Sequence, residues 1–193
     1  MNTDMLTLLK DEELYNIFIN KKSEEALIIL MKRHKEGLVL FINGYVHNIN
    51  NAEELMLDTF AEIVAGPTLF SHRSSFKTWL FSVAKNITLM HLRKENKYIS
   101  LSDDNKMDCY ESSSATPELD ILKNERNRQL YLALDKINPD YRQILILLYF
   151  EDMSHDEAAI IMRKSKKQIY HLAERGRKSL KLQLDKMGFT LDN

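Results

Sequence analysis

The feature that most constrains the fold is an acidic, serine-rich stretch between two long segments with helical periodicity. Residues 96–116, NKYISLSDDNKMDCYESSSAT, show no apolar repeat and carry too little apolar surface to order themselves, which predicts a flexible linker. On both sides, apolar residues recur every three or four positions, as in amphipathic helices. The chain has only 5 Gly and 3 Pro, too few for the frequent turns of an all-β protein. We therefore predict an all-α fold with two small helical domains, residues 10–95 and 117–187, joined by this linker.

The clearest amphipathic helix is expected to begin after Ser74 or Ser75, either of which can cap it, and to end near Lys94. Its apolar positions fall on one face, because they are spaced by four, three, four and three residues: Phe76, Leu80, Val83, Ile87 and Met90. Polar residues occupy the opposite face: Thr78, Ser82, Lys85, Asn86 and Arg93.

Further helices are predicted before this one, over residues 11–49 and residues 52–65. Ser23 is a plausible N-cap for a helix that follows it, and Asn51 for a helix over residues 52–65 that ends at Gly66-Pro67.

The second half of the chain predicts a helix-turn-helix. Thr116-Pro117 and Asn138-Pro139 each read as an N-cap followed by proline at the first helical position. Ser154 to Glu157 has the spacing of a capping box and opens a short helix to about Met162. After a turn at Arg163-Lys164, Ser165 can cap a basic helix that continues to about Lys186. A short helix, a tight turn and a basic second helix are typical of this DNA-binding motif.

The charge distribution indicates two contacts with a polyanion. The formal net charge is −1, but residues 71–98 carry +5 and residues 163–186 carry +7, with −5 over residues 99–125 between them. Basic blocks of this kind suit nucleic acid, although solvated helix faces would also explain them.

Catalytic, metal-binding and membrane-spanning functions find little support in the sequence. There is no phosphate-binding glycine loop and no HExxH motif, and the His and Cys residues lack metal-ligand spacing. The longest apolar run, Ile144 to Phe150, is too short to cross a bilayer. The single cysteine, Cys109, excludes an internal disulfide. We expect a cytoplasmic protein that is not an enzyme, inserts into no membrane, and uses no cofactor, metal or small-molecule substrate.

The two basic blocks offer different chemistry. In the helix-turn-helix, the candidate base readers lie early in the second helix and the candidate phosphate contacts follow: Lys166, Lys167, Tyr170, His171 and Glu174, then Arg175, Arg177 and Lys178. The alternative is a basic surface helix of a protein-binding module. The first block mixes basic, small polar and aromatic residues, so Phe76, Trp79 and Phe81 could stack on unpaired bases. The alternative there is that these rings belong to the core.

Three segments, in this order, resemble the extracytoplasmic-function (ECF) sigma factors of bacterial RNA polymerase. They are AEELMLDTFAEIV (52–64), SSFKTWLFSVAKNITLMHLRK (74–94) and LDKINPDYRQILILLYFEDMSHDEAAIIMRKSKKQIYHLAERGRKSL (134–180). The resemblance implies that the first binds the core polymerase, the second melts and reads the minus-ten element, and the third reads the minus-thirty-five element.

Combining the resemblance with the residue chemistry gives three candidate sites. The expected contacts with core polymerase are Glu53, Glu54, Leu55, Asp58 and Phe60. The expected minus-ten contacts are Ser74, Ser75, Phe76, Lys77, Thr78, Trp79, Lys85, Asn86 and Arg93. The expected minus-thirty-five contacts are Ser165, Lys166, Lys167, Gln168, Tyr170, His171, Glu174, Arg175 and Lys178.

Three positions depart from the family pattern. Leu57 replaces the usual glutamine, Arg163 stands where the turn usually has glycine, and Glu174 is acidic where aromatic or basic residues are usual. If the turn needs a positive φ, Arg163 costs roughly 1 kcal/mol.

We therefore expect a sigma factor that binds core polymerase and directs it to promoters, and an anti-sigma factor is a further expected partner. The main alternative is a stand-alone helix-turn-helix transcription regulator, which leaves the basic-aromatic block unexplained. A helical adaptor that does not bind DNA is the third possibility. Promoter binding with and without core polymerase separates the first two, and salt-dependent DNA affinity separates both from the third.

Overall fold

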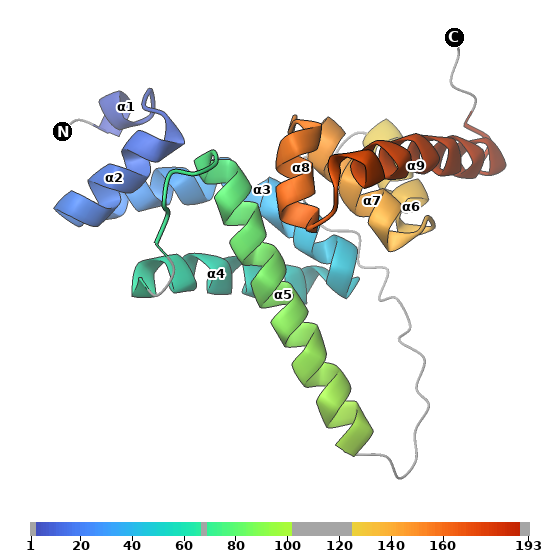
Figure 1. Cartoon of the computed structure of the whole chain (residues 1–193), viewed down its shortest axis with the longest axis horizontal. Helices are drawn as coiled ribbons and strands as arrows, with labels where there is room; N and C mark the ends of the chain where they lie inside the picture. The colour runs from blue at the N-terminus through green and yellow to red at the C-terminus, as the bar shows by residue number, and fades with distance from the viewer. Residues whose placement is uncertain (1–2, 67–68, 102–124, 190–193) are drawn as a thin grey trace.

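The computed structural model describes residues 3–66, 69–101 and 125–189, which form helices joined by short loops (Figure 1). The first domain contains α1 (Thr3–Leu6), α2 (Asp11–Lys21), α3 (Glu24–Val46), α4 (Ile49–Ala65) and α5 (Phe76–Leu101). The second domain contains α6 (Glu125–Asp135), α7 (Pro139–Leu145), the π-helical turn η2 (Ile146–Phe150), α8 (His155–Met162) and α9 (Lys166–Lys186). The predicted all-α fold with two helical domains is confirmed.

Helix α3 forms the centre of the first domain, because α2, α4 and α5 all pack against it. In its second half, residues 38–42 are apolar and buried all round, as expected for a helix enclosed by neighbours. Asp11 fixes α2 on α3: its carboxylate accepts a hydrogen bond from Arg33 Nη1 at 2.7 Å and lies 2.8 Å from His34 Nε2. Burial would raise the pKa of Asp11, but the hydrogen bonds and charges of His34 and Arg33 lower it below its ordinary value.

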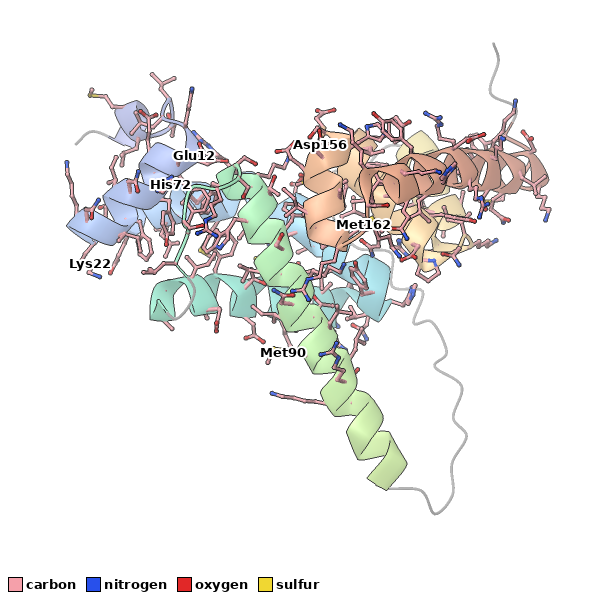
Figure 2. The ribbon with its side chains drawn as sticks, in the orientation of Figure 1. Glu12, Lys22, His72, Met90, Asp156 and Met162 are labelled. Atoms are coloured by element: carbon pink, nitrogen blue, oxygen red, sulfur yellow. The ribbon has the colours of Figure 1, made fainter. Side chains whose placement is uncertain are left out.

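An aromatic cluster holds the start of α5 against α2. The rings of Tyr15, Phe70, Phe76 and Trp79 have centroids 5.4 to 5.7 Å apart. Aromatic pairs at such distances contribute about 0.5–1.5 kcal/mol each beyond the area they bury. The backbone N–H of Phe76 donates to the Glu12 carboxylate at 2.8 Å, so a side chain of α2 satisfies one free donor at the start of α5. Figure 2 shows Glu12 beside that end of the helix.

Side-chain caps place most helix starts where the sequence predicts them. Ser23 accepts from the backbone N–H of Ala26, and Ser75 from that of Thr78. The prediction that Asn51 caps α4 is wrong: the cap is Asn48, whose side chain accepts from the backbone N–H of Asn51, so the helix begins three residues earlier. Gly66 ends α4 in the left-handed conformation, with φ 78°.

Helix α5 is longer than the sequence predicts. It continues to Leu101 rather than ending near Lys94, so the start of the acidic segment, residues 96–101, is helical. The rest of the predicted linker, residues 102–116, lies outside the described residues, as does the predicted helix start at Thr116-Pro117.

The second domain is built around the apolar run that follows Asn138, which caps α7 with Pro139 at its first position. Ile144, Leu145, Ile146 and Leu147 are buried. The run ends at Phe150 as predicted, although its last part is a π-helical turn rather than an α-helix. Helix α9 packs against α6, α7 and α8.

The two domains contact each other. Helix α8 lies against α5, and α7 and η2 lie against α3 (Figure 1). No helix in the described part of the chain is both long and apolar enough to cross a membrane.

Candidate polymerase and DNA interfaces

Helix α4 carries the predicted polymerase-binding residues, and the structure divides them into two groups. Leu55 and Phe60 are buried, so they pack α4 against the core and offer no surface to a partner. Glu54 and Asp58 are exposed, one turn apart, and the Glu53 side chain is half-exposed. The face open to a partner is therefore acidic, because only the carboxylates of this set reach its surface.

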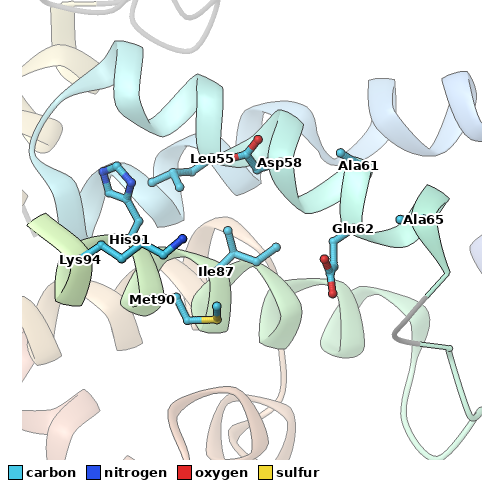
Figure 3. A pocket seen from close by; sticks show the side chains of 9 residues that line it. All are labelled: Leu55, Asp58, Ala61, Glu62, Ala65, Ile87, Met90, His91 and Lys94. Atoms are coloured by element: carbon cyan, nitrogen blue, oxygen red, sulfur yellow. The ribbon is translucent and has the colours of Figure 1, made fainter.

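Two grooves flank α4, and neither is predicted from the sequence. One, of about 390 Å³, lies between α3 and α4 and is lined mainly by apolar side chains, including the exposed Ile28 and Leu57. The other, of about 420 Å³, lies between α4 and α5 and includes Asp58, Met90 and Lys94 (Figure 3). Met90 is 55% exposed although its position in the heptad-like stripe predicts burial. The sequence signal that could have indicated an apolar groove was Leu57, an apolar residue beside Glu54 and Asp58 on the predicted acidic helix.

The helix-turn-helix is formed as predicted. Ser154 and Glu157 make a reciprocal capping box at the start of α8, and Ser165 and Gln168 make another at the start of α9. Arg163, between the helices, is left-handed with φ 53°. Because non-glycine residues pay roughly 1–2 kcal/mol in this conformation, the arginine strains the turn, as its replacement of glycine predicts.

The polar face of α9 is exposed to solvent. The predicted contacts on it are Lys166, Lys167, Tyr170, His171, Glu174, Arg175 and Lys178. Ser165 and Gln168 are also exposed, but their side chains are engaged in the cap. The opposite face, with Ile169, Ala173 and Gly176, is buried.

Some residues of this α9 face have exposed partners. Lys166 pairs with Asp156 and Lys178 with Glu174, both at 2.8 Å. Tyr170 stacks on His155, with ring centroids 4.2 Å apart. Exposed ion pairs contribute less than about 1 kcal/mol, so a DNA phosphate can replace either carboxylate at small cost. Arg177, also a predicted phosphate contact, donates to the Tyr149 hydroxyl at 2.9 Å.

The aromatic residues of the predicted minus-ten segment belong to the core of the first domain. Phe76 and Phe81 are fully buried, and Trp79 is half-buried in the aromatic cluster. Of the two alternatives for Phe76 and Phe81, burial supports the core, because neither ring has a free face to stack on a base. Ser74 is half-buried and Arg93 is exposed.

The polar residues of the same segment face the second domain. Ser75 Oγ and Thr78 Oγ1 donate to one carboxylate oxygen of Glu157 at 2.9 Å each. Lys77 Nζ lies 2.8 Å from a carboxylate oxygen of Glu151. The amphipathic pattern predicts a polar face on α5, and here α8 covers its first part: Thr78 is buried and Lys85 half-buried, whereas Asn86 stays exposed.

The end of α8 makes two more contacts with α5. Lys85 Nζ donates to the carbonyl oxygen of Ile161 at 3.0 Å, and Asn86 Oδ1 accepts from Arg163 Nη2 at 2.8 Å. Burial lowers the pKa of Lys85, and the nearby charges of Arg163 and Lys164 lower it further. Figure 2 shows α8 between Asp156 and Met162, beside the upper half of α5.

Two family descriptions match the chain in the order that the motifs predict. "Sigma-70 region 2" matches residues 30–98, and "Sigma-70, region 4" matches residues 127–180. The ECF RNA polymerase sigma factor SigX of Bacillus subtilis is 26% identical over 166 residues, which are 84% of this chain and 85% of SigX. The chain belongs to the ECF-type RNA polymerase sigma factors. The ECF sigma factor SigM of the same organism is 28% identical over 130 residues, 67% of this chain and 77% of SigM.

Two solved structures share the fold of this sigma factor. One is the sigma factor RpoE of Bartonella quintana in complex with the anti-sigma factor NepR, with a TM-score of 0.61 and 22% identity over 80% of this chain and 94% of RpoE. The other is CnrH in complex with the cytosolic domain of CnrY, with a TM-score of 0.60 and 18% identity over 96% of this chain and 99% of CnrH.

Membership of the family establishes the general function. This sigma factor binds RNA polymerase and DNA, directs the polymerase to promoters, and is not an enzyme. The stand-alone regulator and the helical adaptor are set aside, because neither accounts for the match to region 2.

Proposed function

We propose that three surfaces of this sigma factor divide promoter recognition between them. The acidic face of α4 binds core polymerase, α9 reads the upstream duplex element, and the polar face of α5 captures the melted minus-ten strand. In the same proposal, residues 10–95 and 117–187 are the two functional domains and residues 96–116 join them. The observation that carries it is that the candidate polar side chains lie on three separate helices, two of which expose them together.

For α4, the chemistry favours a partner that is both basic and apolar. Glu54 and Asp58 offer exposed carboxylates, and Leu57 lies between them with 53% of its surface exposed. Opposite charges steer the encounter of two proteins and set their register, while apolar contact adds affinity. Glu53 contributes at the edge, and the buried Leu55 and Phe60 hold the helix in place.

For α9, the first two turns suit the major groove. Lys166, Lys167, Tyr170 and His171 lie there and offer donors and a ring to base edges. Further along, Arg175 and Lys178 lie where phosphate contacts are expected. Glu174 is exposed and can accept from a cytosine amino group once Lys178 turns to a phosphate.

For α5, the polar face offers hydroxyl, amide and ammonium groups to an unpaired strand. Melting costs a few kcal/mol per base step, and each captured base returns about 1–3 kcal/mol. Several contacts are therefore needed, and Ser75, Lys77, Thr78, Lys85 and Asn86 supply them once α8 has left.

A photo-crosslinking experiment tests the three assignments together. Leu57, Tyr170 or Ser82 is replaced by benzoylphenylalanine, and the holoenzyme is bound to a promoter selected by run-off transcription with purified core polymerase. We expect crosslinks to a polymerase subunit, to upstream duplex DNA and to melted strand, respectively. The same amino acid at Asn20, exposed on α2, is the control. A probe at position 170 that crosslinks only to polymerase removes the assignment of α9.

We also propose that this sigma factor works in the cytoplasm, where polymerase and promoters are, and that an anti-sigma factor controls it. One solved structure with the same fold is a sigma factor bound to the anti-sigma factor NepR, and the other, CnrH, is bound to the cytosolic domain of CnrY, which supports the second proposal. Affinity purification of the tagged protein from its own cells tests it. The expected result is a co-purifying protein that competes with core polymerase in a binding titration.

A further inference from the structure

We propose that the second domain inhibits the first by direct contact: it engages the polar side chains on the strand-capture face of α5 and buries part of that face, while leaving the α4 and α9 surfaces open. The inference rests on the proposed assignment of strand capture to α5. It goes beyond that assignment because it makes the same residues a docking surface within the chain.

The contact is specific, because α8 meets α5 in matching order along both helices. Glu157 in the first turn of α8 meets Ser75 and Thr78, and Ile161 and Arg163 at its end meet Lys85 and Asn86. Thr78 is fully buried. Each of these polar groups has a partner in the other domain, so the contact satisfies groups that a captured strand would otherwise satisfy.

Glu157 joins the two domains through one carboxylate. One oxygen accepts from the Ser154 backbone N–H and hydroxyl, completing the capping box of α8. The other accepts from Ser75 Oγ and Thr78 Oγ1. Burial raises the pKa of Glu157, but these hydrogen bonds together lower it below its ordinary value. The carboxylate therefore stays ionised and presents a negative charge where a strand phosphate is expected.

Lys77 is engaged in the same way. Its ammonium lies 2.8 Å from a Glu151 carboxylate oxygen and donates to the Glu151 backbone oxygen at 2.7 Å. Only 12% of the Glu151 side chain is exposed, so the pair is largely shielded from solvent. A strand phosphate and this carboxylate compete for one cation.

Two glycines on α3 supply independent evidence that the domains are shaped for each other. A Cβ at Gly37 would lie 2.1 Å from Glu151 Oε1, and a Cβ at Gly44 would lie 2.3 Å from Gln143 Nε2. Glycine within a helix is less favourable than alanine, and the three atoms nearest to each added Cβ all belong to the second domain. Both glycines permit close approach by the second domain.

The Gly44 contact is the less adaptable of the two. Gln143 is buried, and its amide donates to the backbone oxygen of Phe41 at 3.2 Å. Its other amide atom, Oε1, has no hydrogen-bond partner in the described part of the chain. The interface is thus well fitted but incompletely satisfied, which suits a contact that must open.

The surfaces needed for the earlier steps remain accessible. Glu54, Leu57 and Asp58 on α4 are exposed with the second domain in place, as are Tyr170 and His171 on α9. The closed arrangement therefore permits binding to polymerase and to duplex DNA but blocks capture of an unpaired strand. A strand that binds only the open form is bound more weakly in proportion to the open fraction.

The test uses full-length protein with Cys109 replaced by serine and dyes on Asn20→Cys and Lys181→Cys, both exposed and outside the contact. Energy transfer between the dyes reports domain separation. Strand affinity is measured with a fluorescein-labelled nontemplate strand from a promoter selected by run-off transcription. Gly44→Ala should lower energy transfer and raise strand affinity by about tenfold, since overpacking penalises only the closed form.

Two further variants keep the test independent of folding. Glu157→Gln retains a residue that can complete the capping box, yet removes the charge that binds Ser75 and Thr78, so it should open the domains in part. Gly44→Ala combined with Gln143→Ala removes the colliding side chain and should close the domains again relative to Gly44→Ala alone. Circular dichroism checks that every variant remains helical.

The outcomes separate this inference from the proposed function. Lower energy transfer with higher strand affinity supports both. Unchanged energy transfer in Gly44→Ala and Glu157→Gln overturns the closed state, even if Lys85→Ala still weakens strand binding. Lower energy transfer with unchanged strand affinity overturns the inhibition and also the placement of strand capture on α5.

Discussion

Helices α5 and α9 each carry a row of basic and polar side chains, but the two rows are in different states. On α9 the row is exposed, and its ion pairs, Lys166–Asp156 and Lys178–Glu174, lie at the surface. On α5 the row is partly covered: Thr78 is buried and Lys85 half-buried, and both donate to the second domain, whereas Asn86 accepts from it while exposed. Surface pairs exchange readily for phosphate, whereas the covered contacts must break together. The difference implies an order of events, with duplex and polymerase binding before strand capture.

The largest effect is expected from the loss of core polymerase binding, because neither α5 nor α9 can then act in transcription. Charge reversal of Glu54 and Asp58 to lysine should cost about 2–5 kcal/mol in core binding, because it sets like charges against a basic partner surface. Transcription should fail although the isolated protein stays folded and still binds duplex DNA. A binding titration with core polymerase measures the loss, with Asp185→Lys as the control. Unchanged core affinity would contradict the assignment of α4.

On α5, the loss of a single polar side chain should have the next largest effect. Lys85→Ala and Asn86→Ala should each weaken strand capture by about 1–3 kcal/mol and leave duplex binding by α9 intact. Permanganate reactivity of melted thymines measures opening, and closed-complex binding is the control. Normal melting by both variants would place strand capture elsewhere.

On α9, a base contact should fail differently from a phosphate contact. His171→Ala should cost roughly 1–3 kcal/mol at one base pair of the upstream element and little elsewhere. Selection of upstream sequences by the variant and the parent measures this change. An identical preference in both would show that His171 does not read a base.

A smaller effect is expected at the end of the same row. Lys178→Ala should weaken binding to all sequences alike and lower the slope of log affinity against log salt by about one. Lys181→Ala, exposed one turn further along, is the matched control. Equal salt slopes in the parent and Lys178→Ala would show that Lys178 contacts no phosphate.

The smallest effect concerns pH and the closed state. The pKa of Glu157 is lowered in the folded protein, so its contribution is complete above the ordinary glutamate pKa and is lost as the pH falls through the lowered value. Around Glu157 the contributing groups are Ser154 on its own helix and Ser75 and Thr78 on α5. Energy transfer between the domains should therefore fall only at acid pH, and Glu157→Gln should reduce that dependence. A parent protein that opens as the pH rises would reverse the predicted sign.

Local features of the fold were predictable because their causes are local. A serine or asparagine before an apolar-periodic run satisfies nearby backbone donors, so the caps at Ser23, Ser75, Ser154 and Ser165 follow from short stretches of sequence. Where two suitable residues stand three apart, as Asn48 and Asn51 do, tertiary packing decides between them.

The relation between the domains could not be predicted from periodicity. The apolar stripe of α5 identifies the face that enters the core, and its polar face reads as solvent-exposed. A polar face can also be covered when another helix supplies hydrogen-bond partners for its polar groups, as Glu157 does for Thr78. The apolar repeat of a sequence does not predict such a contact. The buried positions of Phe76 and Phe81 were one of two alternatives that the sequence left open.

The strained turn at Arg163 has a consequence for how this chain can change through evolution. Glycine there would relieve the left-handed backbone, a gain of about 1 kcal/mol for the helix-turn-helix. It would also remove the guanidinium that holds Asn86. One codon change would therefore stabilise the helix-turn-helix and weaken the contact between the two domains.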